Sequence, residues 1–371
     1  MANLMVRVIT GLLLGLALLA PVQAQVLTDL AGREVRVPER AERIVLGEGR
    51  LLPVLAILEG EQLLERLVGM PADLALVDPG SARQYQQAFP ALAKVPRIGQ
   101  GAADSFSLEQ VLTLRPDLAI FSLSGHGPDS TQGRLIEQLQ RAGVAVLFVD
   151  FREQPLANTP RSMTLLGQAL GRQARADAFN AAHAEALAAV RERLPQGAAL
   201  KVFLHSRAGL GEGCCESMAR GMFADLLAEA GGDNIARERL PGHAGTLSLE
   251  LLLSQPPELY IASAVGSADS LAEGASYIAL GPGVAADAAQ ASLKRLLGRG
   301  GLQHLSAVRE GRAHAIWHGF YNSPFNVVAV QVFAKWLHPE AFADLDPQRT
   351  LERFYGEFQP VALDGQYWIS L

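Results

Sequence analysis

The sequence has little cysteine, few aromatic residues and no excess of positive charge. Only 2 of its 371 residues are cysteine, which excludes a small domain held together by several disulfides. With 32 Lys and Arg against 38 Asp and Glu the formal net charge is −6, so no positive field attracts nucleic acid or anionic lipid. Hydrophobic residues make up 49% of the chain, which excludes disorder. We expect a globular protein that binds no nucleic acid and does not insert into a membrane.

The apolar run at the N-terminus is the only long one. It covers residues 8–20, follows Arg7 and is succeeded by small residues up to Ala24. This is the pattern of a secretory signal peptide that is cleaved before Gln25. A membrane anchor is the alternative, but ~13 apolar residues are too few to cross a hydrocarbon core of ~30 Å. We expect export to a bacterial periplasm.

The two cysteines, Cys214 and Cys215, are adjacent. Without a third cysteine, a disulfide to a distant part of the chain is excluded. Adjacent Cα atoms lie ~3.8 Å apart, below the usual disulfide range of ~4.4–6.8 Å, so a bond between neighbours is strained. Both states stay open: a disulfide between neighbours or two buried thiols. Zinc sites need more ligands than this pair supplies.

An internal repeat predicts two similar halves. Residues 107–120 align without gaps on residues 248–261, with seven of the fourteen positions identical. In each copy a serine can cap a short helix, Glu109 or Glu250 lies in its first turn, and a proline ends it before an apolar strand. Chance similarity of two helix-to-strand connections is the alternative interpretation. The repeat favours two α/β lobes.

The rest of the chain fits an α/β plan. Short apolar runs bounded by Gly, Pro or charge alternate with helical patterns, which is typical of buried parallel strands. The predicted strands cover residues 44–46, 67–69, 144–149, 200–204 and 313–316, and the predicted helices cover residues 51–58, 135–141, 222–230 and 327–337.

A long helical segment separates the halves. Residues 172–194 contain no proline, are rich in Ala and charged residues, and end before Pro195. Their apolar spacing predicts one continuous helix, about 35 Å long, that acts as a rigid strut. The expected organisation is a signal peptide over 1–24, an N-terminal lobe over 25–171, a connecting helix over 172–194 and a C-terminal lobe over 195–371.

Several segments, taken in order, resemble one family. They are residues 27–38 followed by Arg43-Ile44-Val45, residues 109–120, residues 230–235 and residues 308–316. They are similar to the class III periplasmic substrate-binding proteins of ABC importers for ferric siderophores, haem and cobalamin. The resemblance covers essentially the whole mature chain. It implies two α/β sandwich lobes joined by a single long α-helix, with the ligand in a cleft between them.

The resemblance also implies a function. We expect a monomer that captures a ferric siderophore and delivers it to an inner-membrane ABC permease, with no catalytic residues, no resident cofactor and no metal held by the protein alone. In this family an exposed acidic residue on each lobe pairs with permease arginines, and the matching residues here are Glu109 and Glu250. The alternative is that both carboxylates only complement a helix dipole.

Loops that follow the carboxyl ends of the strands are expected to line the cleft. Arg50, Arg152 and Arg207 offer forked hydrogen bonds to an anionic chelate. Residues 317–326 concentrate aromatic and imidazole rings in a chain with only 6% aromatic residues. The alternatives are a solvated surface for each arginine and helix packing for the rings. The predicted ligand-binding residues are Arg50, His126, Arg152, Arg207, Trp317, His318, Phe320, Tyr321 and Phe325.

Other cargoes on the same fold stay open. Haem needs an axial ligand, for which Tyr277, Tyr321, His126 and His318 are candidates. Cobalamin or a metal oxyanion is equally compatible, the latter through backbone amides of Gly-rich loops. A free metal ion is disfavoured because the eight histidines form no HxH or HExxH motif. An exported hydrolase is disfavoured because GxSxG and Walker motifs are absent from the sequence.

Overall fold

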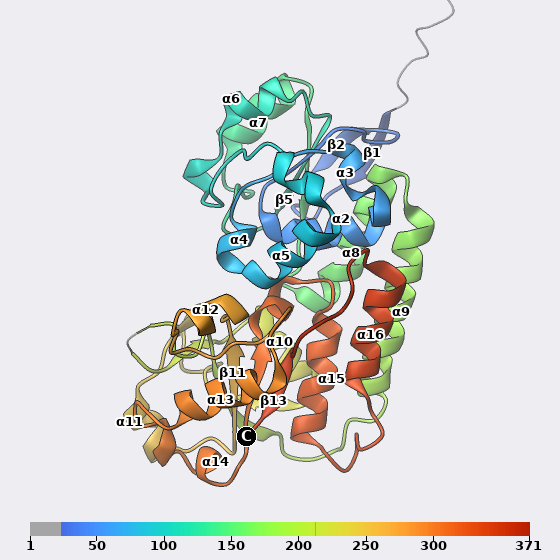
Figure 1. Ribbon diagram of the computed structural model, residues 1–371. Coiled ribbons are helices and arrows are strands. Elements are labelled where there is room, and N and C mark those ends of the chain that lie inside the picture. The colour runs from blue at the N-terminus through green and yellow to red at the C-terminus, as the bar shows by residue number, and fades with distance from the viewer. Residues whose placement is uncertain (1–23, 212) are drawn as a thin grey trace, which may run out of the picture.

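The computed structural model describes residues 24–211 and 213–371 and has two lobes joined by a long helix (Figure 1). The N-terminal lobe lies at the top of the view, the C-terminal lobe at the bottom, and α9 runs along one side of both. The signal peptide predicted over 1–24 lies outside the described residues, except for Ala24. Within the described part of the chain, no helix combines the length and apolarity needed to cross a membrane.

The N-terminal lobe contains an antiparallel hairpin and a parallel four-stranded sheet in the order β4-β3-β5-β6. Every residue of β5 and β6 is buried, as expected for strands covered on both faces. The strands predicted over 44–46, 67–69 and 144–149 are confirmed. The strands are β1 Ala24–Thr28, β2 Glu34–Pro38, β3 Ile44–Leu46, β4 Leu67–Gly69, β5 Leu118–Ser122 and β6 Ala145–Val149. The helices are α2 Leu52–Glu59, α3 Leu63–Arg66, α4 Leu74–Val77, α5 Pro79–Ala88, α6 Leu108–Thr113, α7 Gly133–Arg141 and α8 Pro155–Leu170, and the short 3₁₀ turns are η1 Gly49–Leu51, η2 Gly60–Gln62, η3 Pro90–Lys94 and η4 Ala103–Ser105.

The C-terminal lobe is built on a mixed sheet in the order β10-β8-β7-β11-β12-β13, with β9 also paired to β7. Strands β9, β7, β11 and β12 are parallel. Strand β8 runs antiparallel to β7, β10 runs antiparallel to β8, and β13 runs antiparallel to β12. The strands are β7 Leu200–His205, β8 Glu216–Met218, β9 Gly232–Asn234, β10 Ala244–Thr246, β11 Leu259–Ala264, β12 Ala313–Trp317 and β13 Trp368–Ser370. The helices are α10 Met222–Glu229, α11 Leu249–Ser254, α12 Ala268–Ala272, α13 Ala286–Leu297, α14 Ser306–Arg309, α15 Asn326–Leu337 and α16 Pro347–Phe358, and the 3₁₀ turns are η5 Leu302–His304 and η6 His318–Asn322.

The sequence repeat is a structural repeat. The hydroxyl of Ser107 accepts a hydrogen bond from the Gln110 amide at 3.3 Å and caps α6, and Ser248 caps α11 through the Leu251 amide at 3.1 Å. Each short helix leads into a strand at the centre of its sheet: β5 lies between β3 and β6, and β11 between β7 and β12. The prediction of two similar α/β lobes is confirmed.

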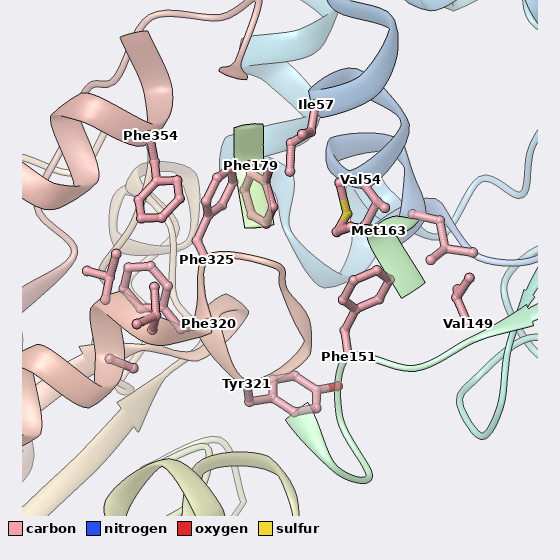
Figure 2. Close-up of a cluster of buried hydrophobic side chains, with 14 of the residues drawn as sticks. Val54, Ile57, Val149, Phe151, Met163, Phe179, Phe320, Tyr321, Phe325 and Phe354 are labelled. Carbon is pink, nitrogen blue, oxygen red and sulfur yellow. The ribbon is translucent and has the colours of Figure 1, made fainter. Parts of the chain in front are cut away.

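Helix α9, Gln173–Arg191, lies where the sequence predicts one continuous helix. It packs against α2 and α8 of the N-terminal lobe and against α15 and α16 of the C-terminal lobe. Phe179 of α9 is fully buried, and the centroid of its ring lies 6.1 Å from that of Phe325 and 5.4 Å from that of Phe354 (Figure 2). The largest hydrophobic core therefore continues from one lobe to the other across α9.

A buried polar network fixes α9 against its neighbours. The Asn326 amide nitrogen donates to Thr159 Oγ1 at 2.8 Å, which leaves its carbonyl oxygen to accept from His183 Nε2 at 2.9 Å. These residues belong to α15, α8 and α9. Burial lowers the pKa of His183, so the ring is neutral and the donor and acceptor roles are complementary.

Contacts on the side of the cleft near α5 also join the lobes directly. Arg83 of α5 forms a bidentate ion pair with Asp269 of α12, with Nη1 2.7 Å from Oδ1. The neighbouring Gln84 donates to Asp364 Oδ1 at 2.8 Å. The C-terminal segment thus returns to the N-terminal lobe, and the two lobes are held together at more than one place.

The adjacent cysteines are bonded to each other. Cys214 and Cys215 form a disulfide in the loop before β8. Cys215 is buried in the core of the C-terminal lobe, and Cys214 is half-buried against it. Of the two states that the sequence leaves open, the structure has the disulfide.

A buried ion cluster holds the start of α9. Glu59, at the end of α2, pairs with Arg66 and with Arg172 Nη2 at 2.9 Å. Arg66 Nη1 also donates to the carbonyl of Leu170, the last residue of α8, at 3.0 Å. Both Glu59 and Arg66 are buried, so each charge depends on its partner.

Replacing Glu59 tests this cluster. Glu59→Ala is expected to lower the free energy of unfolding by about 3–5 kcal/mol, because it leaves the Arg66 charge buried and uncompensated. The matched control Glu61→Ala, at an exposed residue of the same loop, is expected to change it by less than about 0.5 kcal/mol. Urea denaturation measures both, and equal effects of the two substitutions would show that the cluster does not stabilise the fold.

His205 makes stability depend on pH. The residue is 4% exposed, its Nδ1 lies 2.7 Å from the Tyr260 hydroxyl oxygen, and burial lowers its pKa to about 4. The imidazole of the unfolded chain titrates near 6.5. The folded state therefore has its full stability with respect to His205 above about pH 6.5, and it loses stability as the pH falls from 6.5 towards 4. We expect His205 alone to lower the free energy of unfolding by about 3 kcal/mol over that range. His205→Gln is expected to flatten the curve of unfolding free energy against pH, and parallel curves for the two proteins would contradict the assignment.

Candidate functional site

The cleft between the lobes is lined by loops from the carboxyl ends of the parallel strands of both sheets. Loops after β3, β5 and β6 contribute from the N-terminal lobe, and loops after β7, β11 and β12 from the C-terminal lobe. Its volume is about 450 Å³, within the range of small-molecule sites. The predicted ligand-binding residues that line it are Arg50, His126, Arg152, Arg207, His318 and Tyr321.

Two arginines of the N-terminal lobe converge on one aromatic ring of the C-terminal lobe. The guanidinium carbons of Arg50 and Arg152 lie 5.6 Å and 5.8 Å from the centroid of the Tyr321 ring. Within the described part of the chain, Arg50 Nη1 and Arg152 Nε are buried without a hydrogen-bond acceptor. No other nitrogen of these two guanidiniums has a protein acceptor among the described residues either, and those nitrogens are not fully buried, so they are the donors that a ligand in the cleft can reach.

Buried carboxylates hold the loops that carry these arginines. Asp73 Oδ1 accepts from the Gly49 amide at 2.9 Å, next to Arg50. Asp150, 1% exposed, accepts from the backbone amides of Arg152 at 2.9 Å and of the next two residues. Both arginines therefore extend from fixed backbone, which reduces the ordering cost of binding.

The third arginine is already paired. Arg207 Nη2 lies 2.6 Å from Glu216 Oε1. The buried Glu48, bonded to the Ser122 hydroxyl, and Glu153 add two more carboxylates around the cleft. Together with Asp73 and Asp150 under the neighbouring loops, these carboxylates outnumber the three arginines, so the cleft has no excess of positive charge.

One histidine from each lobe, His126 and His318, lines the cleft. His318 is 8% exposed, its Nδ1 lies 2.9 Å from Ser263 Oγ, and its ring centroid is 4.5 Å from that of Tyr321. Burial, and then the charge of Arg50, hold its pKa well below the ordinary value. Loss of water contact and the same arginine also lower the pKa of His126. Both imidazoles are therefore neutral at neutral pH.

A narrower crevice continues from the cleft between the lobes. The two spaces share Arg50 and His318, and the crevice is lined further by Trp317 and Phe325. Its volume is about 50 Å³, room for one or two water-sized groups. Trp317 thus lies beside the cleft and borders the crevice. Phe325 borders the crevice by one edge and otherwise packs against Phe179 and Tyr355.

Phe320 lies in the core, and its prediction as a ligand-binding residue is wrong. It is 0% exposed and packs against Trp317 and Tyr367, with ring centroids 5.2 Å and 5.9 Å away. The reason is the 3₁₀ geometry of η6, with three residues per turn. His318 and Tyr321 share one face, which turns to the cleft, whereas Phe320 points into the protein.

Several residues that line the cleft were not predicted from the sequence. Leu76 of α4 is 73% exposed and Leu210, in the loop after β7, is 50% exposed, and they approach the cleft from opposite lobes. Met218 and His243 also line it. No sequence motif identifies them, because the packing of the two lobes against each other is what places them in the cleft wall. Tyr277, a candidate in the haem alternative, lines the cleft as well.

The structure brings few metal ligands together. In residues 24–211 and 213–371, no three His, Cys, Asp or Glu side chains are clustered so that they could hold a metal ion. The arrangement can bind a ligand through guanidinium donors, imidazole and aromatic surface.

Solved structures with this fold cover nearly the whole chain. The TroA-like periplasmic binding protein FepB from Veillonella parvula is 23% identical, with 93% of this chain and 99% of that chain covered and a TM-score of 0.82. The molybdate periplasmic binding protein MolA of Haemophilus influenzae, bound to molybdate, is 15% identical over 92% of this chain and all of its own (100%), with a TM-score of 0.67. A periplasmic heme binding protein from Pseudomonas aeruginosa is 22% identical over 81% of this chain and 94% of its own, with a TM-score of 0.52. At these identities the likeness shows the fold.

The family is shown by the sequence itself. No curated protein sequence matches the chain, but residues 65–316, more than half of it, match the family model described as periplasmic binding protein. Proteins of this family capture small molecules for ABC permeases and are solute-binding proteins. The two lobes, the connecting helix and the cleft agree with that match, and the chain belongs to the periplasmic binding protein family.

Proposed function

We propose that this protein captures a ferric siderophore in the cleft and delivers it to an inner-membrane ABC permease. The observation that carries the proposal is the pair of guanidiniums, Arg50 and Arg152, which meet over Tyr321 and whose accessible nitrogens have no acceptor among the described residues. An iron chelate presents anionic oxygens at its surface, which are the acceptors that forked guanidinium donors bind best. The export of the chain, with cleavage before Gln25, is part of the same proposal.

The other walls of the cleft suit the organic part of a chelate. Tyr321 offers a flat ring, and Leu76 and Leu210 offer apolar surface at the mouth. Ligand sites of this kind combine mostly apolar walls with a few placed polar groups. Because α9 and the Arg83–Asp269 pair already hold the lobes together, we expect little closure on binding.

Fluorescence of Trp317 tests the cargo. Trp336→Phe and Trp368→Phe leave Trp317, beside Arg50 and His318, as the only tryptophan. We expect saturable quenching by one ferric siderophore, with a dissociation constant below about 1 µM, and none by free divalent metals. Quenching only by haemin, cobalamin, molybdate or a bare metal would show that the siderophore is not the ligand. No quenching by any ligand, siderophores included, would contradict binding in this cleft.

Neutral replacement of the arginines locates the ligand. Arg50→Gln and Arg152→Gln are each expected to weaken binding of the quenching chelate about ten- to a hundredfold, because each removes hydrogen bonds from a charged donor. The control Arg36→Gln changes an exposed arginine on β2, away from the cleft, and is expected to have no effect. Equal affinity in all four proteins would place the ligand elsewhere.

We also propose that the repeat supplies the permease contacts. Glu109 and Glu250 are exposed on α6 and α11, which lie at the outer ends of the two lobes, on the side away from α9 (Figure 1). The equivalent leucines of the repeat, Leu112 and Leu253, are also exposed, at 37% and 44%. Each lobe therefore presents the same pair of a carboxylate and a leucine one helical turn apart, a pattern that fits a partner with two equivalent halves.

Removal of both carboxylates tests the docking proposal. The double variant Glu109→Ala and Glu250→Ala is expected to keep its chelate affinity and to lose at least about tenfold in permease-dependent uptake. The control double variant, Glu39→Ala and Glu340→Ala, removes exposed glutamates from other faces and is expected to transport normally. Weaker chelate binding by the first variant, or normal uptake, would show that these carboxylates are not docking residues.

A further inference from the structure

The hydroxyl of Ser263 joins the backbone of one cleft loop to the imidazole of another. Ser263 lies on β11 and is 0% exposed. Its Oγ accepts a hydrogen bond from the Arg207 amide at 2.8 Å and lies 2.9 Å from His318 Nδ1. These two are its hydrogen-bond partners within the described chain.

This arrangement determines where the proton of His318 lies. The hydroxyl has one hydrogen, and the Arg207 amide is itself a donor, so Nδ1 is the acceptor within reach. If Nδ1 carried the proton instead, the hydroxyl would accept twice and its own hydrogen would be buried without an acceptor, which is costly. The Ser263 hydroxyl therefore donates to Nδ1, and the neutral ring carries its proton on Nε2.

The Nε2 atom is available to a ligand. It has no hydrogen-bond partner among the described residues, and it is not one of their fully buried unpartnered atoms. The ring lines both the cleft and the crevice and lies next to Tyr321. Arg50 and Arg152 lie over that same tyrosine.

We propose that His318 is a neutral hydrogen-bond donor, and that its Nε2–H, together with Arg50 and Arg152, selects an oxyanion group of the ligand. The inference rests on the proposed function and narrows it. A ring nitrogen that carries a proton has no lone pair to give to a metal. His318 is thereby a specificity residue for a charged oxygen and not an axial ligand of haem or a ligand of a bare metal ion.

Nitrogen NMR of the ligand-free protein tests the proton position. Long-range ¹H–¹⁵N spectra distinguish a protonated from an unprotonated ring nitrogen, and His318→Gln identifies the signal. We expect Nε2 protonated and Nδ1 unprotonated, and a mixture of both forms after Ser263→Ala. A proton on Nδ1 in the unaltered protein overturns the inference. This experiment needs no cargo, so it fails or succeeds independently of the siderophore proposal.

Simple ions test the ligand class. Citrate or molybdate at millimolar concentration is expected to shift the His318 Nε2–H signal, whereas zinc ions are expected to leave the proton in place. No shift with either anion, or loss of the Nε2 proton to zinc, overturns the inference.

Two variants separate a donor from a packing role. His318→Phe keeps a ring in place but removes the donor, and it is expected to weaken binding of the anion that shifts His318 by about tenfold or more. His318→Gln provides a side-chain N–H donor in a similar position, and it is expected to bind the anion nearly as tightly as the unaltered protein. Equal affinities for the two variants, both with unaltered thermal stability, would contradict a donor role.

Discussion

The packing of α9 against both lobes is the constraint on which the rest of the structure depends. A linker rich in glycine would let the lobes move apart, but α9 buries apolar side chains against helices of both lobes along its whole length. Phe179 packs against Phe325 and Phe354 on one side, and the Glu59 cluster fixes the start of the helix on the other. The position and width of the cleft follow from this packing.

The same packing positions the face that lines the cleft. Phe325 belongs to the segment that also carries His318 and Tyr321, and its contact with Phe179 anchors that segment to α9 (Figure 2). The 3₁₀ turn then directs Tyr321 towards the arginines of the opposite lobe. The site is therefore preformed: folding already fixes its side chains and loops, so binding costs little further conformational entropy.

Local pattern was enough to predict many of the elements and much of the cleft, but not the helices α5, α8, α13 and α16. The strand over 44–46 and the helix over 172–194 follow from apolar periodicity and from Pro and Gly at their ends. Arg50, His126 and Arg152 were predicted because loops at the carboxyl ends of parallel strands meet at one edge. For the adjacent cysteines the sequence left two states open, and the structure has the disulfide.

The remaining features depend on contacts that the sequence does not show. The pairing of Arg207 with Glu216 follows from the turn between β7 and β8, and the contact of Ser263 with His318 joins residues 55 positions apart. Phe320 was predicted wrongly because the phase of a 3₁₀ turn, and not composition, decides which ring of an aromatic run lines the cleft. Leu76 and Leu210 lie in the wall only because two lobes meet there.

The central claim is that this cleft binds a chelated iron through the anionic oxygens of the chelate. Anomalous scattering at the iron absorption edge, from crystals grown with a ferric siderophore, tests it most directly. The account predicts one iron atom between Tyr321 and the guanidiniums of Arg50 and Arg152, with chelate oxygens between the metal and these side chains and with His318 Nε2 bonded to an oxygen. An iron atom outside the cleft, or one coordinated directly by His318, would contradict it.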